Sequence, residues 1–116
     1  MARTTEFLPA TALRTLGDPV RLRIVALLAR PDAACCSIAD RVCACDLERV
    51  LGLAQPTISH HMKILCDTGL VESQKAGKFV FYRLNRTQFH KLAGWLTEFA
   101  GEPKDGPDPQ FAEDAA

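Results

Sequence analysis

The segment DLERVLGLAQPTISHHMKILCDTG, residues 46–69, decides the fold. Its first part, residues 46–51, has apolar side chains at helical spacing and ends at Gly52. A short link follows, and residues 57–68 form a second helical pattern that Gly69 closes. Two short helices joined by a tight connection are typical of a helix-turn-helix, in which the second helix enters the major groove of DNA.

The sequence after this segment changes to the alternating pattern of strands. Residues 70–74 and 79–84 are rich in β-branched and aromatic side chains, and residues 75–78 between them are basic, so the stretch predicts a hairpin with a basic tip. Asn85 can cap a last helix. That helix carries an apolar stripe of Phe89, Leu92, Ala93, Leu96 and Phe99.

The sequence before the segment predicts two further helices. Residues 8–16 have helical spacing and stop at Gly17, and Asp18-Pro19 opens a strongly apolar helix that ends near residue 30. Residues 37–42 fit either one helical turn or a loop. The predicted order is α-α-α-α-β-β-α, a mainly α winged helix-turn-helix with a β-hairpin wing.

Composition fits one small domain. The chain has 116 residues, 47% of them hydrophobic, and a net charge of zero. Residues 101–116 hold five acids and one base, so residues 1–100 have 13 Lys/Arg against 9 Asp/Glu and are mildly basic, which permits phosphate binding. We expect residues 1–100 to form the DNA-binding and dimerisation domain and residues 101–116 to be a disordered acidic tail.

No apolar run approaches the roughly 18 residues that span a bilayer, and the N-terminus lacks the pattern of a secretory signal. We therefore expect a cytoplasmic protein with no membrane partner.

A helical wheel divides the predicted recognition helix into two faces. Ile58, Met62 and Leu65 share the core side, and His61 falls beside them, where we expect it to be partly buried and hydrogen-bonded. The other side chains would contact bases or phosphates, although ordinary solvated positions would give the same pattern. The candidate DNA-binding residues are Gln55, Thr57, Ser59, His60 and Lys63, with Lys75 and Lys78 on the wing.

Four of the five cysteines, Cys35, Cys36, Cys43 and Cys45, lie within eleven residues. A secreted disulfide framework would spread its cysteines along the chain, so this cluster points to metal ligands or redox sensors in a reducing compartment. Thiolates select soft or borderline ions such as arsenite, antimonite, Cd(II), Pb(II) or Zn(II). Cys66 stands apart, and we expect it to be a small buried side chain.

Three separated stretches resemble the ArsR/SmtB family of metal-responsive repressors. They are LGDPVRLRI at residues 16–24, LAQPTISHHMK at residues 53–63 and VFYRL at residues 80–84. The resemblance covers about residues 10 to 100. It implies a homodimer joined mainly through the first and last helices, bound to double-stranded operator DNA and released when an inducer binds.

The arsenic-responsive branch of that family carries a Cys-x-Cys-Asp-Leu-Cys motif, and residues 43–48 read CACDLE. The resemblance thus assigns Cys43 and Cys45 as metal ligands, but Glu48 occupies the place of the third thiol. Cys35 and Cys36 are the candidates for the missing sulfur, and their seven- or eight-residue distance from Cys43 is easily closed by the chain.

The expected inducer is arsenite or antimonite, with Cd(II) and Pb(II) as alternatives, and DNA binding itself needs no cofactor. The family's second, zinc-responsive site would retain only Glu102, so we expect no such site.

Other functions fit parts of the sequence. The cysteines of the same repressor could instead form a redox switch. A thiol oxidoreductase or arsenate reductase is disfavoured, because the chain has no Cys-x-x-Cys pair, no phosphate-binding glycine loop and no βαβ pattern. An interaction module with a degenerate helix-turn-helix is a further alternative, and it would bind no operator.

Overall fold

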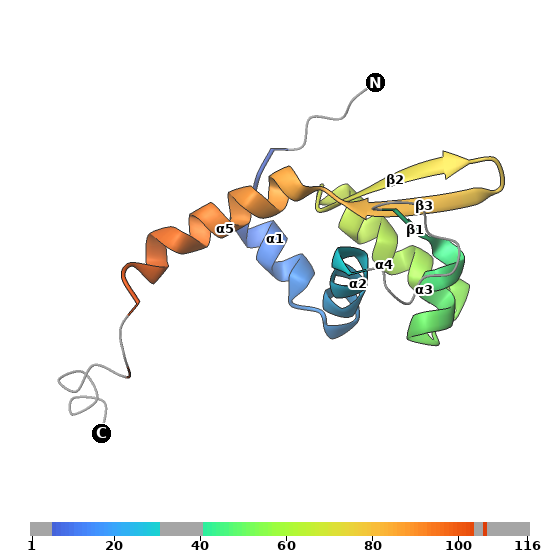
Figure 1. The fold of residues 1–116 in the computed structure, drawn as a ribbon, viewed down its shortest axis with the longest axis horizontal. Coiled ribbons are helices and arrows are strands. Elements are labelled where there is room, and N and C mark those ends of the chain that lie inside the picture. Colours follow the sequence, from blue (N-terminus) through green and yellow to red (C-terminus); the bar gives the residue numbers. More distant parts are fainter. Residues whose placement is uncertain (1–5, 31–40, 104–105, 107–116) are drawn as a thin grey trace.

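The computed structural model describes residues 6–30, 41–103 and 106 (Figure 1). The helices and strands confirm the mainly helical fold with a β-hairpin. In chain order they are α1 (Pro9–Leu16), α2 (Pro19–Ala29), β1 (Val42–Cys43), α3 (Ala44–Leu51), α4 (Gln55–Asp67), β2 (Val71–Ala76), β3 (Phe79–Leu84) and α5 (Arg86–Ala100).

Two helix starts are fixed by the capping residues that the sequence predicts. The Asp18 carboxylate accepts from the Val20 N–H and the Asn85 side chain from the Gln88 N–H, both at 3.4 Å, so the two predicted N-caps are confirmed. Gly52 ends α3 in the left-handed region at φ 65°, which favours glycine. Gly17 also ends its helix, but in right-handed geometry at φ −72°.

The sheet has one strand more than the predicted pair. Its order is β1-β3-β2 with antiparallel neighbours, and β1 pairs Val42 with Tyr82 and Cys43 with Phe81. The sequence did not indicate β1, because two residues are too few to show an alternating pattern. The predicted four-residue tip is also shorter: Lys75 lies in β2 opposite Val80, and the turn follows at Gly77.

The core lies where α2, α3 and α4 pack against the sheet. The largest fully buried side chains include Ile24 and Leu28 of α2, Leu47 of α3, and Met62 and Leu65 of α4. These side chains hold α4 against the body along one face only, which leaves its opposite face free.

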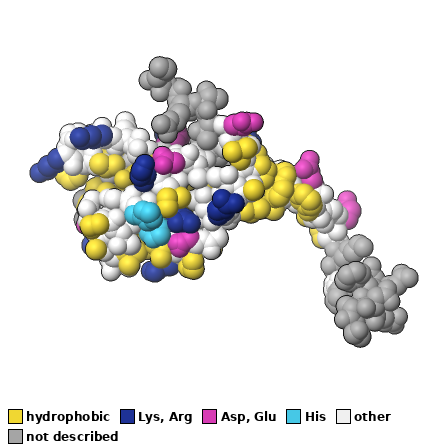
Figure 2. Space-filling model, turned by 180° about the vertical axis from the view of Figure 1, so that it is seen from behind, with side chains coloured by type: hydrophobic (Ala, Val, Ile, Leu, Met, Phe, Trp, Pro, Cys, Tyr) yellow, Lys and Arg dark blue, Asp and Glu magenta, His cyan; other side chains and the backbone are white. Residues whose placement is uncertain are grey.

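Helix α5 runs alongside α1 and then projects beyond the body (Figure 1). Phe99 near its end is 71% exposed and Leu96 is 45% exposed. Figure 2 shows hydrophobic side chains gathered along this projecting helix. Among the residues that the structure describes, no helix combines the length and apolar character needed to cross a membrane.

Candidate nucleic-acid interface and thiol site

Helix α4 has the two faces that its sequence predicts. Ile58, Met62 and Leu65 are at most 3% exposed and pack into the core. The candidate base-contacting and phosphate-contacting side chains of this helix are all exposed: Gln55, Thr57, Ser59, His60 and Lys63. They are therefore all accessible on the part of α4 that the core does not cover.

Two exposed side-chain contacts link polar residues of this face. Gln55 Nε2 donates to Ser59 Oγ at 2.8 Å, and Lys63 Nζ lies 3.5 Å from Asp67 Oδ2. Both pairs are exposed, so DNA can replace them at little cost. The first turn of α4 has no side-chain cap, and its backbone N–H groups can therefore bind a phosphate.

The wing supplies the second basic element. Lys75 and Lys78 are both exposed, and the Lys78 ammonium lies 5.7 Å from the centre of the Phe79 ring. Figure 2 shows Lys and Arg side chains at the far end of the hairpin. The sequence-predicted lysines thus project from the wing, Lys75 from the strand and Lys78 from the turn.

His61 is more buried than the exposed polar side chains of α4, as predicted. Its side chain is 14% exposed, and Nδ1 lies 3.4 Å from Arg21 Nη1 and 3.9 Å from Asp18 Oδ2. The prediction of a partly buried, hydrogen-bonded histidine is confirmed. The partners were not predicted, because they are 40 or more residues earlier in the chain.

Cys43 and Cys45 meet at the junction of β1 and α3. Cys43 is the last residue of β1 and the N-cap of α3, and Cys45 lies in the first turn of the helix. Their sulfur atoms are 3.0 Å apart. Cys43 is 2% exposed, whereas Cys45 faces solvent. Two soft ligands therefore lie together at the start of the helix that precedes α4.

A third sulfur does not join them among the residues that the structure describes, which contain no cluster of three or more His, Cys, Asp or Glu side chains able to hold a metal ion. Cys35 and Cys36 lie outside the described residues. Cys66 is half-buried on α4 and lines a pocket with Ser73 and Tyr82 of the sheet. Burial raises the pKa of the Cys66 thiol, which makes it a poorer ligand at neutral pH.

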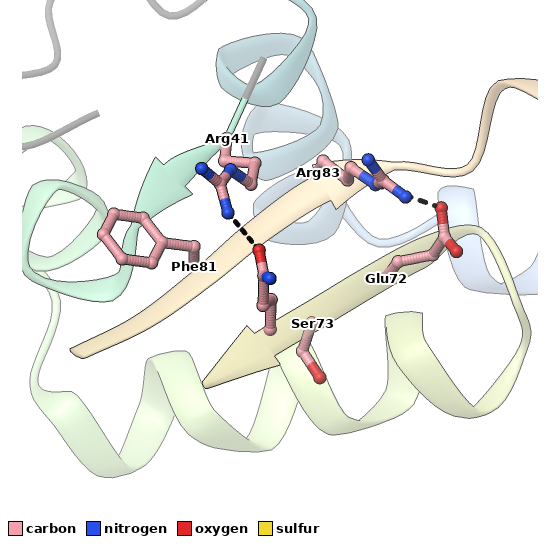
Figure 3. A pocket seen from close by; sticks show the side chains of 6 residues that line it. Arg41, Glu72, Ser73, Phe81 and Arg83 are labelled. Atoms are coloured by element: carbon pink, nitrogen blue, oxygen red, sulfur yellow. Dashed lines mark hydrogen bonds and ion pairs between the residues drawn. The ribbon is translucent and has the colours of Figure 1, made fainter. Parts of the chain in front are cut away.

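Arg41 links the end of the chain segment that carries Cys43 to the wing, and the sequence did not predict this contact. Its guanidinium donates to Gln74 Oε1 of β2 and lies 5.5 Å from the centre of the Phe81 ring of β3. These residues, with Glu72 and Arg83, line a pocket of about 280 Å³ (Figure 3). Phe81 is also the strand partner of Cys43. A movement of Cys43 would thus reach both strands of the hairpin.

The fold and this arrangement agree with comparisons to known proteins. Residues 18–73 match the family model "Bacterial regulatory protein, arsR family". The chain is 42% identical over 76 residues to an arsenical resistance operon repressor of Staphylococcus xylosus, a match that covers 66% of this chain and 64% of the relative. The chain thus spans somewhat less than two thirds of that relative.

Two further comparisons cover more of the molecule. A biofilm growth-associated repressor of Xylella fastidiosa is 32% identical over 96 residues, which are 82% of this chain and 76% of the relative. The crystal structure of a possible transcriptional regulator for arsenical resistance superposes with a TM-score of 0.63 at 26% identity, over 78% of this chain and 84% of that one.

These relatives are regulators of transcription rather than enzymes, and the solved structure shares the fold described above. The chain belongs to the arsR family of bacterial regulatory proteins.

Proposed function

We propose that this protein is a transcriptional repressor that leaves its operator when a thiol-seeking metalloid, arsenite or antimonite, binds at Cys43 and Cys45. The observation that carries the proposal is the 3.0 Å approach of the two sulfurs at the start of α3, the helix that precedes the exposed recognition helix α4. The name of the staphylococcal relative, an arsenical resistance operon repressor, supports the same class of inducer.

The DNA-binding unit is a homodimer. Leu96 and Phe99 of α5 are exposed, as are Leu8 and Leu13 at and just before α1. Apolar side chains of this size on neighbouring helices are stabilised when a second copy covers them. A two-fold dimer presents two α4 helices to a palindromic operator, with the two wings outside them.

The inducer needs a third sulfur, which Cys35 or Cys36 supplies. In this step trihydroxyarsenic(III) exchanges its three hydroxyl groups for three thiolates, and three thiol protons leave with them as three waters. No change of oxidation state occurs. Glu48 is a hard oxygen donor and does not replace a thiolate for a soft ion.

Release follows from the position of Cys43. The residue ends β1, which pairs with the wing, and is the N-cap of α3, which packs on α4. Drawing its sulfur toward a third thiol therefore displaces the wing and the recognition helix together. The inducer binds the displaced conformation more tightly, and that difference in affinity is the coupling free energy, about 1–3 kcal/mol in typical allosteric proteins.

The test is a fluorescence-anisotropy titration of the reduced protein on DNA from upstream of its own gene, at stated salt, with arsenite, antimonite, Cd(II), Pb(II) and Zn(II) added in turn. We expect high-affinity binding that arsenite and antimonite reverse. A Cys66→Ser variant is the matched control and should respond like the wild type. Binding that ignores every ion would refute metalloid sensing, and absence of binding to any duplex would refute the repressor.

A redox-responsive repressor is the second candidate, and the same sulfur–sulfur approach favours it. Two-electron oxidation by a peroxide would join Cys43 and Cys45 in a disulfide, with loss of both thiol protons as the peroxide is reduced to water. Release by peroxide without metal, together with a mass 2 Da lower in the released protein, would identify this mechanism.

A further inference from the structure

Three elements of the fold meet at a partly buried group of polar side chains that the DNA-binding face does not use. Arg21, near the start of α2, donates from Nε to the Thr15 carbonyl in the last turn of α1 at 2.8 Å. The same guanidinium approaches Asp18, the N-cap of α2, at 3.8 Å and His61 of α4 at 3.4 Å. One side chain therefore touches the end of α1, the start of α2 and the middle of α4.

Two side chains at the start of α2 face the same ring nitrogen of His61. Nδ1 lies 3.4 Å from Arg21 Nη1, which can only donate, and 3.9 Å from Asp18 Oδ2, at the N-cap of α2. The planar fork of arginine can hold several acceptors in a fixed arrangement, which the single ammonium of lysine cannot reproduce. Arg21 thus constrains the position of α4 relative to the junction of α1 and α2.

This group is mostly shielded from solvent, although its edge reaches the surface of the body. The side chains of Arg21, Asp18 and His61 are only 15%, 22% and 14% exposed. Figure 2 shows histidine side chains with basic and acidic side chains beside them on one face of the body. The group borders the proposed DNA contact His60, whose ring centroid lies 5.6 Å from that of His61. The Arg21 guanidinium itself is directed to Thr15, Asp18 and His61.

We propose that Arg21, with Asp18 and His61, is the joint that sets the position of the recognition helix relative to the dimerisation helices. The proposal rests on the dimeric mode of DNA binding given above. In that mode α1 belongs to the dimer interface and α4 to the operator contact. The joint between them fixes the separation and tilt of the two α4 helices, and with them the spacing of half-sites that the protein accepts.

The consequence is a selective effect on palindromic DNA. A subunit that has lost the joint still carries an intact α4 and wing, so it binds a single half-site normally. Two such subunits in a dimer no longer hold their α4 helices at the spacing of the operator. The dimer therefore binds the second half-site more weakly. We therefore identify Arg21 and His61 as positioning residues.

The test compares two duplexes, a palindrome selected by the wild-type protein from a random library and the same duplex with one half-site scrambled. Arg21→Met and His61→Leu remove the hydrogen bonds and keep apolar bulk. His61→Asn keeps an acceptor close to the place of Nδ1 and should rescue. Arg23→Met is the matched control, since Arg23 is exposed on the same helix and its loss changes the net charge equally.

We expect Arg21→Met and His61→Leu to bind the palindrome about tenfold more weakly, the factor for one hydrogen bond to a charged group. Half-site affinity and the salt dependence should stay unchanged, and His61→Asn and Arg23→Met should resemble the wild type. The joint variants should also accept palindromes with one base pair added between the half-sites more readily than the wild type does.

Three outcomes would overturn the inference. An equal loss of affinity for both duplexes, together with a shallower salt dependence of DNA binding for Arg21→Met, would make Arg21 a phosphate contact. Equal losses with unchanged salt dependence and a lower melting temperature would make the group merely structural. Unchanged affinity of both variants for both duplexes would remove any positioning role. A wild type that binds the palindrome no better than the half-site would instead refute the dimeric mode itself.

Discussion

Cys43 and Cys45 should behave alike as ligands and differently as parts of the fold. Replacing either with serine removes one of the two converging sulfurs, so both variants should lose release by arsenite. Their effects on stability should differ, because Cys43 is 2% exposed between β1 and α3 while Cys45 faces solvent. The pair therefore separates loss of sensing from loss of folding.

The expected difference in stability between the two variants follows from the burial of Cys43. A hydroxyl at position 43 would lie in the core with the Cys45 sulfur, a weak acceptor 3.0 Å away, as its neighbour. Burying a poorly hydrogen-bonded hydroxyl costs about 1–3 kcal/mol. For a domain of this size each kcal/mol lowers the melting temperature by about 4–8 °C. Cys45→Ser should change stability by less than about 0.5 kcal/mol, as is usual for exposed substitutions.

The assay combines thermal unfolding of the reduced proteins with operator titrations below their melting temperatures, with and without arsenite. We expect the wild type to melt highest, Cys45→Ser to melt close to it and Cys43→Ser to melt clearly lower. All three should bind the operator equally well, and only the wild type should be released. Release of either variant by arsenite would refute the assigned ligands, and equal melting of the two variants would refute the reasoning from burial.

Three further predictions concern the wing, α5 and the remaining thiol. Lys75→Gln with Lys78→Gln should make the salt dependence of operator binding shallower by about 1–2 in log–log slope, since each lysine–phosphate contact contributes about 0.9; an unchanged slope would remove the wing from the DNA contact. Leu96→Glu should yield monomers in sedimentation equilibrium and weaken operator binding, because a charge would be buried at the proposed dimer interface; a stable dimer would place that interface elsewhere. The Cys66 thiol should be alkylated by iodoacetamide more slowly than a free cysteine at pH 8, and its reactivity should continue to rise above pH 9. The reason is that burial raises its pKa from the ordinary value of 9.0 and so lowers the thiolate fraction at neutral and mildly basic pH. An alkylation rate equal to that of a free cysteine would contradict this prediction.

The parts of the fold that sequence predicted are those with local causes. The caps at Asp18 and Asn85 are hydrogen bonds within three residues, and the buried face of α4 follows from helical spacing alone. The same holds for Gly52, where the backbone needs a left-handed residue. Such features depend on the neighbouring residues in the chain, so a single sequence contains enough information to find them.

The features of the fold that the sequence did not predict depend on residues that are distant in the chain. β1 exists because Val42 and Cys43 pair with β3, and no pattern of two residues signals a strand. Arg41 contacts Gln74 across 33 positions, and Arg21 contacts His61 across 40. In each case only the tertiary structure brings the partners together, so the residues that connect the candidate sites could not be found beforehand, although the candidate sites themselves could.

The shortness of β1 would suit the proposed switch at the thiol pair. A strand of two residues contributes few ladder hydrogen bonds, and each adds about 1 kcal/mol of net stability. Displacing β1 thus costs about as much as the 1–3 kcal/mol that couples an inducer to DNA affinity in typical allosteric proteins. A longer strand at this edge would resist the inducer, and a loop would leave the wing insensitive to it. Because Cys43 ends β1 and Arg41 precedes it, a metalloid bound to the thiols as proposed would act on the shortest strand of the sheet, at the point where that strand pairs with the wing.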